Sequence, residues 1–212
     1  MKQIEKIVYL IFLLTLPSCK DSIINPIDNV KASIIPFAIG NKWTYVDSLY
    51  TDSGIIVDTF VTEISYMRKE NSLTWWEFSH WFNPSIYARE FTVTNDSIFS
   101  LQYNEGPHGI VSIKSLEYLY PINADTTFYR SLYDGDVVIN KATLYSSTIV
   151  TPAYVFSESI LIFYEVAEEF FREIVVPGIG MVDLTIENHS TISIYRWWTR
   201  RRILLLNYNL TK

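Results

Sequence analysis

From Asn41 to the C-terminus, the sequence alternates between apolar and polar residues with a period close to two. Trp43–Leu49 and Ser97–Tyr103 show the alternation, and short turns such as Thr51–Gly54 interrupt it. Successive side chains of a β-strand point to opposite faces of a sheet, so this period is typical of half-buried strands. The chain also contains 15 Tyr, 12 Phe and 6 Trp, residue types that favour pleated surfaces. The pattern predicts an all-β fold, a single antiparallel meander curved into a barrel, half-barrel or sandwich.

One segment, Ser157–Val176, leaves two alternatives open. Its centre, Ala167–Glu169, suits a helix. The alternation of apolar residues from Ile160 to Val166, together with the β-branched content, favours two strands joined by a turn at Ala167–Glu169. We expect the hairpin and keep the helix as the alternative.

The N-terminus has the organisation of an export signal. Met1–Lys6 carries two lysines, and Ile7–Leu16 is an apolar run of ten residues, too short to cross a membrane, which takes about 20 residues. Cys19, the only cysteine of the chain, follows directly, in a pattern that resembles a bacterial lipobox. The resemblance implies that residues 1–18 are a lipoprotein signal peptide and that Cys19 carries acyl chains; the alternative is a stray thiol beside an ordinary signal peptide.

These features predict three parts: the signal peptide, a lipid-anchored tether at residues 19–36, and a β domain at residues 37–212. Two or more acyl chains give stable anchoring without a transmembrane helix. We therefore expect a protein of the bacterial cell envelope, periplasmic or surface-exposed, with the outer membrane as the favoured site. The formal net charge of −6 argues against nucleic acid as a partner, because nucleic acid requires a basic footprint.

Three short motifs carry a resemblance to a known family. Ile35–Tyr45 matches a Phe-Pro…Gly-Asn-x-Trp-x-Tyr start, Pro177–Val182 matches Pro-Gly-x-Gly-x-Val, and Leu205–Asn209 echoes a closing Leu-x-x-Tyr-Asn. In these motifs the chain resembles a family of uncharacterised secreted bacterial lipoproteins. The resemblance implies an exported β domain and assigns no activity.

Residues able to support catalysis are sparse. The three histidines, His80, His108 and His189, lie on separate predicted elements; we expect His80 to be packed in the core, the other two to be solvated, and no metal or cofactor to be bound. Glu168, Glu169 and Glu173 are interpreted as a solvated turn and strand face. The expected function is a non-enzymatic binding or structural module, and the alternative is a hydrolase acting on envelope or extracellular polymers with paired carboxylates.

The surplus of aromatic residues and a cluster of arginines suggest a binding surface. Leu73–Phe82 carries large rings in both phases of its alternation, and a sheet covered on one side buries only one phase. We expect at least one of Trp75, Trp81 and Trp197 to face a glycan, lipid or protein ligand; the alternative is that all three belong to a two-layer core. Near the C-terminus, Arg200 and Arg202 would contribute guanidinium groups for an anionic ligand, or else mark a charged edge strand.

Overall fold

The structure is a computed structural model. It describes residues 33–81, 90–94, 97–106, 109–122, 124–131, 137–166, 169–188 and 200–211, with the backbone alone for 102–113. Within these ranges the regular elements are β-strands, which confirms the predicted all-β class. The described residues include no helix long and apolar enough to cross a membrane.

Fourteen strands are formed by the described residues. They are β1 (Lys42–Thr51), β2 (Gly54–Glu70), β3 (Leu73–Phe78), β4 (Glu90–Thr94), β5 (Ser97–Gly106), β6 (Gly109–Tyr118), β7 (Thr126–Ser131), β8 (Val137–Tyr145), β9 (Ile149–Val150), β10 (Val155–Phe156), β11 (Ser159–Val166), β12 (Glu169–Val176), β13 (Gly180–Asn188) and β14 (Arg200–Asn209).

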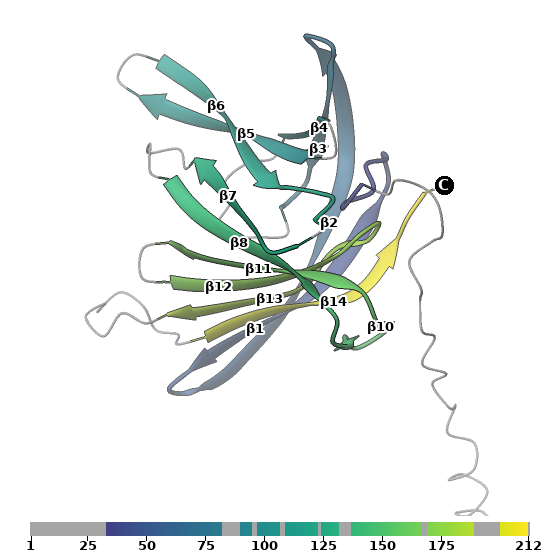
Figure 1. Cartoon of the computed structure of the whole chain (residues 1–212). Coiled ribbons are helices and arrows are strands. Elements are labelled where there is room, and N and C mark those ends of the chain that lie inside the picture. Colours follow the sequence, from purple (N-terminus) through teal and green to yellow (C-terminus); the bar gives the residue numbers. More distant parts are fainter. Residues whose placement is uncertain are drawn as a thin grey trace, which may run out of the picture.

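Twelve of these strands form one antiparallel sheet, in the order β6-β5-β4-β3-β2-β1-β14-β13-β12-β11-β8-β7. Apart from β6 and β7, strands of this sheet that follow one another in the chain are neighbours, as in a meander, and β1 also pairs with β14. The sheet curves until its two end strands, β6 and β7, come near each other, so the barrel is nearly closed (Figure 1). Of the three expected shapes, the structure therefore adopts the barrel. Strands β9 and β10 form a separate small hairpin.

The ambiguous segment is a hairpin of β11 and β12. The two strands pair from Ile160 opposite Val175 to Val166 opposite Glu169. Tyr164 and Phe171 share the inner face of this hairpin and stack with their ring centroids 4.6 Å apart. The alternative of a helix is therefore wrong, because burying one β phase of this segment inside the barrel outweighs the helix propensity of its centre.

The three family-like motifs come together in the fold. From β1, the Trp43 indole Nε1–H donates to the Ile179 carbonyl at 2.7 Å, and the Tyr45 hydroxyl donates to the Met181 carbonyl at 2.9 Å. On the other side of β1, Trp43 lies opposite Tyr208 of β14. Since Trp43 and Tyr45 are fully buried, these motif residues join distant strands and serve the fold.

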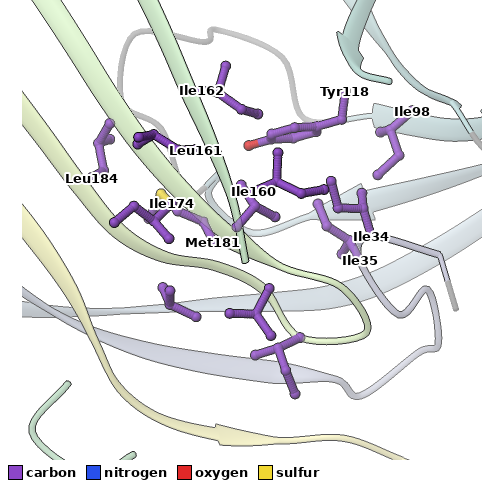
Figure 2. Close-up of a cluster of buried hydrophobic side chains, with 14 of the residues drawn as sticks. Ile34, Ile35, Ile98, Tyr118, Ile160, Leu161, Ile162, Ile174, Met181 and Leu184 are labelled. Carbon is purple, nitrogen blue, oxygen red and sulfur yellow. The ribbon is translucent and has the colours of Figure 1, made fainter. Parts of the chain in front are cut away.

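The end of the predicted tether belongs to the core. Ile34 and Ile35 have no exposed surface, and Figure 2 draws them in the same cluster as Ile98 and Tyr118. The Gly178 N–H also donates to the Ser33 carbonyl at 3.0 Å. Two residues of the stretch that was predicted as a tether thus pack in the core, because burying large apolar side chains is favourable.

Candidate functional site

Two groups of charged and aromatic side chains stand out, one inside the barrel and one on its outer surface. The inner group closes the gap between β6 and β7, which are the ends of the sheet order and have no backbone ladder between them. Across this gap the Ser115 hydroxyl donates to the Ser131 carbonyl at 2.8 Å. Arg130 of β7 donates to the Glu117 carboxylate of β6 at 3.2 Å, with both side chains buried. Side chains therefore seal the seam where backbone hydrogen bonds are missing.

The seam continues into the barrel interior through Glu173 of β12. The Tyr118 hydroxyl donates to the Glu173 carboxylate. Arg130 also lies over the Tyr164 ring, with its guanidinium carbon 4.3 Å from the ring centroid, and the Ser100 hydroxyl donates to Glu117 at 2.5 Å. Three ionisable side chains are thus held among aromatic rings and hydroxyls, and each has a partner.

Burial sets the direction of the pKa shift of the Glu173 carboxyl and of two tyrosine hydroxyls inside the barrel. It raises the pKa of the Glu173 carboxyl from about 4.5 to about 7, while the hydrogen bond from Tyr118 and the charge of Arg130 act in the opposite direction. Burial and the nearby Glu173 charge also raise the pKa of the Tyr45 and Tyr118 hydroxyls. Because Glu117, Arg130 and Glu173 are all buried, a bulky ligand has no access to them, and the seam is structural.

The sequence analysis assigned Glu173 to a solvated face, and that assignment is wrong. Glu173 lies opposite Ile162 and Leu184 on the inner face of the barrel. Glu173 lies two residues after the buried Phe171 on β12, so both side chains point to the same face. The alternation of the sequence therefore indicates that Glu173 faces the interior. Of its two expected neighbours, Glu169 is half-buried and Glu168 lies outside the described residues.

The outer group lies on the opposite face of the same strands. Phe163 of β11 stands directly opposite Lys141 of β8 on one side and Arg172 of β12 on the other. Thr185 of β13 and Arg202 of β14 continue this rung. Phe163 is 44% exposed, so it presents an aromatic ring to solvent between two cations.

A second rung runs parallel to the first, nearer the strand ends. Phe170, which is 45% exposed, lies opposite Glu165 and Glu187. Glu187 in turn lies opposite Arg200, and Arg200 lies opposite Tyr50 of β1. The Arg200 guanidinium is engaged on both sides, with Nε 4.0 Å from Glu187 and the guanidinium carbon 5.7 Å from the Tyr50 ring centroid.

Together the two rungs line an open pocket of about 850 Å³. Its apolar surface comes from the exposed side chains Val137, Ile139, Phe163 and Phe170. Its charges come from three cations, Lys141, Arg172 and Arg200, and two carboxylates, Glu165 and Glu187. Ligand pockets typically have volumes of about 300–1,000 Å³ and combine an apolar lining with a few polar groups, and this pocket meets both conditions.

The predicted arginine surface is divided by the structure. Arg200 lines the pocket, whereas Arg202 forms a bidentate pair with Asp183 at 3.1 and 2.8 Å. Arg201 forms a similar pair with Asp47. The interpretation as an edge strand is wrong, because β14 lies between β1 and β13 in the interior of the sheet. Two of these arginines therefore cross-link neighbouring strands.

Two of the three tryptophans in the predicted surface are buried in the structure. Trp75 and Trp81 are each only 6% exposed. Trp81 stacks on Phe91 with a centroid separation of 3.5 Å, and Trp75 lies beneath the Arg68 guanidinium at 5.8 Å. Both rings are therefore covered, and the expectation that at least one of the three tryptophans faces a ligand stays a prediction. Trp197 and Cys19 lie outside the described residues.

The histidine expectations also change. His80 is exposed rather than packed, because β3 ends at Phe78 and the alternation does not continue beyond it. His108 and His189 lie outside the described residues. No group of three or more potential metal ligands occurs within the ranges that the structure describes.

Apart from Arg200, the pocket residues were missed at the level of sequence, although a signal existed. In Ser157–Val176 the apolar phase of the first strand contains Ile160, Ile162 and Tyr164, so Phe163 is an aromatic residue in the polar phase. The pair Phe170-Phe171 must likewise place one ring on the outer face. An aromatic residue out of phase on each arm of one hairpin indicates a shared exposed surface.

Comparisons with known proteins add two similar structures. No protein-family model and no curated protein matches the sequence. A putative lipoprotein from Parabacteroides distasonis has 11% identity and a TM-score of 0.47, covering 85% of this chain and 100% of that chain. A putative exported protein with a YmcC-like fold from Bacteroides fragilis has 11% identity and a TM-score of 0.41, covering 84% of this chain and 100% of that one.

Proposed function

We propose that the chain is a lipid-anchored protein of the bacterial cell envelope that binds a ligand in the outer pocket of its barrel. The observation that supports binding is the open pocket of about 850 Å³, in which Phe163 and Phe170 remain exposed. Exposing large apolar side chains costs free energy, roughly 1.5–3 kcal/mol for each one left fully in water, so a cluster of them is typical of an interaction site. Anchoring is supported by the lipobox-like sequence that ends at Cys19.

The arrangement of the barrel suits an anchored binding protein. Ser33, the first described residue, contacts the turn between β12 and β13 at Gly178. Phe170 lies near the opposite end of β12, six residues from Val176, which corresponds to roughly 20 Å along a strand. A tether of residues 20–32 would reach at most about 45 Å when fully extended. The pocket would then open at the end of the domain away from the anchor.

Catalysis has weaker support than binding. The carboxyl group with the raised pKa, Glu173, is buried at the seam, where a polymer cannot reach it. A hydrolase would instead have to use Glu165 and Glu187, which line the pocket. Glu187 is near Arg200, an arrangement that also serves to order the pocket wall.

Binding is tested with a neutral apolar probe, N-phenyl-1-naphthylamine, whose fluorescence rises in an apolar site. We expect saturable binding by the wild-type protein and a loss of at least tenfold in affinity for Phe163→Ser combined with Phe170→Ser. Tyr66→Ser is the matched control, since Tyr66 is an exposed ring on β2 outside the pocket. Equal binding by all three proteins, or no binding by any, would contradict the proposal.

Anchoring is tested separately by intact-mass measurement of protein extracted from the membranes of its bacterial host. We expect a mature chain that begins at Cys19 and carries acyl chains. A chain that begins elsewhere, or an unmodified Cys19, would overturn this part of the proposal.

A further inference from the structure

Some of the charged side chains around the pocket have a partner of opposite charge and others do not. This difference indicates what kind of ligand the pocket binds. Arg200 is engaged by Glu187 and Tyr50. Among the described residues, Lys141 and Arg172 have no carboxylate within ion-pair distance. The chain carries 23 acidic and 17 basic residues, so carboxylates are in excess. Within the described part of the chain, Lys141 and Arg172 remain without one, and both line the same pocket.

The position of these two cations is set by the strand register. Lys141 and Arg172 flank Phe163 on the two neighbouring strands, so their backbones are roughly 10 Å apart. Both side chains are long and flexible, with an apolar stem and a charged end. The two charged ends can therefore converge on a single anionic group held above the Phe163 ring.

A polar group without a partner adjoins the same rung. Thr185 lies opposite Arg172 and lines the pocket. Thr185 is 4% exposed, and its side-chain oxygen is buried without a hydrogen-bond partner. A buried hydroxyl without a partner costs free energy, and an oxygen of a ligand near Arg172 would supply the missing hydrogen bond after a small shift of the surrounding side chains.

We infer that the pocket takes an amphipathic anion, with its carboxylate or phosphate group between Lys141 and Arg172 and its apolar chain over Phe163 and Phe170. The inference rests on the proposed binding function and adds the chemical class of the ligand. A charge-assisted hydrogen bond from each cation orients the anionic group, and the exposed apolar residues supply the hydrophobic part of the affinity.

The experiment measures displacement of bound N-phenyl-1-naphthylamine by ligands that share a twelve-carbon chain, each used below its micelle concentration. Dodecanoate and dodecyl phosphate are anionic, dodecyl maltoside is neutral, and dodecyltrimethylammonium is cationic. We expect both anions, or the one whose head group fits better, to displace the probe at concentrations about tenfold lower than the neutral compound. A preference for the carboxylate would indicate a fatty-acid-like ligand, and a preference for the phosphate would indicate a lipid head group.

Variants locate the anionic group. Lys141→Gln and Arg172→Gln should each weaken binding of the preferred anion about three- to fivefold, because exposed ion pairs are worth up to about that much, and should leave binding of dodecyl maltoside unchanged. Lys69→Gln is the matched control, since Lys69 is an exposed lysine of β2 outside the pocket. Thr185→Val should also weaken binding of the preferred anion.

The outcomes separate this inference from the proposed function. Suppose that probe binding depends on Phe163 and Phe170 but anionic, neutral and cationic compounds displace the probe equally well. That result would contradict the inference that the ligand is an anion, and the proposed binding function would still hold. If acetate or inorganic phosphate displaced the probe as strongly as the twelve-carbon anions do, the inference that the ligand has an apolar chain would be wrong. Absence of probe binding, with no displaceable site, would contradict the proposed function itself.

Discussion

The seam inside the barrel and the pocket on its outer face contain the same kinds of residue, but the charged side chains are paired and buried at the seam and partly exposed in the pocket. At the seam, Arg130 is paired with Glu117 and covered by the Tyr164 ring. In the pocket, Arg172 lies beside the exposed Phe163 ring without a carboxylate partner among the described residues. A buried charge must be paired because desolvation is costly, whereas a partly exposed charge is solvated and stays available to a ligand. Burial therefore decides which arginine is structural.

The largest expected effect is at the seam. Arg130→Met should lower the free energy of unfolding by about 3–5 kcal/mol, because the buried Glu117 carboxylate loses its partner. Urea unfolding followed by tryptophan fluorescence measures this change. The double variant Arg130→Met with Glu117→Gln should recover much of the loss, since no unpaired buried charge remains. A loss below about 1 kcal/mol for the single variant would show that the seam does not depend on this pair.

Burial of aromatic rings gives the next contrast between inside and outside. Trp81→Ala should cost about 3–5 kcal/mol, because Trp81 stacks on Phe91 in the core. Phe163→Ala, at a ring that is 44% exposed, should cost less than about 1 kcal/mol. Thermal and urea unfolding of the two variants compare these costs. Equal destabilisation would mean that the outer ring is part of the packed structure and would remove the main support for a binding surface.

The pH dependence of stability tests the buried carboxyl at the seam. The pKa of Glu173 is raised from about 4.5 to about 7, so the folded protein holds a proton that the unfolded chain releases. Its contribution to stability is therefore fully present below about pH 4.5 and is lost as pH rises to about 7 and above, a change of roughly 2–3 kcal/mol.

Glu173→Gln keeps the shape and cannot ionise. Between pH 4.5 and pH 8, the free energy of unfolding of the wild type should fall relative to that of the variant by roughly 2–3 kcal/mol. Urea unfolding at each pH measures this difference. Glu165→Gln, which removes a carboxyl at the outer pocket, is measured alongside as the control. A difference that does not vary with pH would show that Glu173 is not held protonated.

The smallest expected effect is at the outer cations. Lys141→Gln and Arg172→Gln should change the free energy of unfolding by no more than about 0.5 kcal/mol, because neither residue forms an ion pair among the described residues. Differential scanning calorimetry with and without dodecanoate checks this. Both variants should melt with the wild type in the absence of the anion and gain less from its addition. A large loss without the anion would assign these cations a structural role.

Part of the fold could be predicted because it depends on local pattern. The alternation around Ile160–Val166 predicted the inward-facing side chains of β11, and the turn expected at Ala167–Glu169 placed the hairpin correctly. The same alternation failed at His80, because the pattern does not say where a strand ends. It also does not say which aromatic rings are covered, as Trp75 is by Arg68 of the neighbouring strand.

The candidate site was largely out of reach of the sequence. Lys141, Phe163 and Arg172 lie on three separate strands, and only the register between those strands places them in one rung. A shift of one residue in any of these strands would send its member of the rung to the interior. Arg200 was chosen for its charge and does line the pocket, but its neighbour Arg202 is held by Asp183, a residue nearly twenty positions away.

The sequence by itself determined the all-β class, hairpins such as β11–β12 and the inward phase of β11, because these follow from alternation and turn residues within short stretches. Only the tertiary structure decided that the meander closes on itself through Glu117 and Arg130, that Ile34 and Ile35 belong to the core, and that an open pocket lies across five strands. Such features depend on contacts between residues distant in the chain, whose energies come from burial and pairing in three dimensions and leave no periodic trace in the sequence.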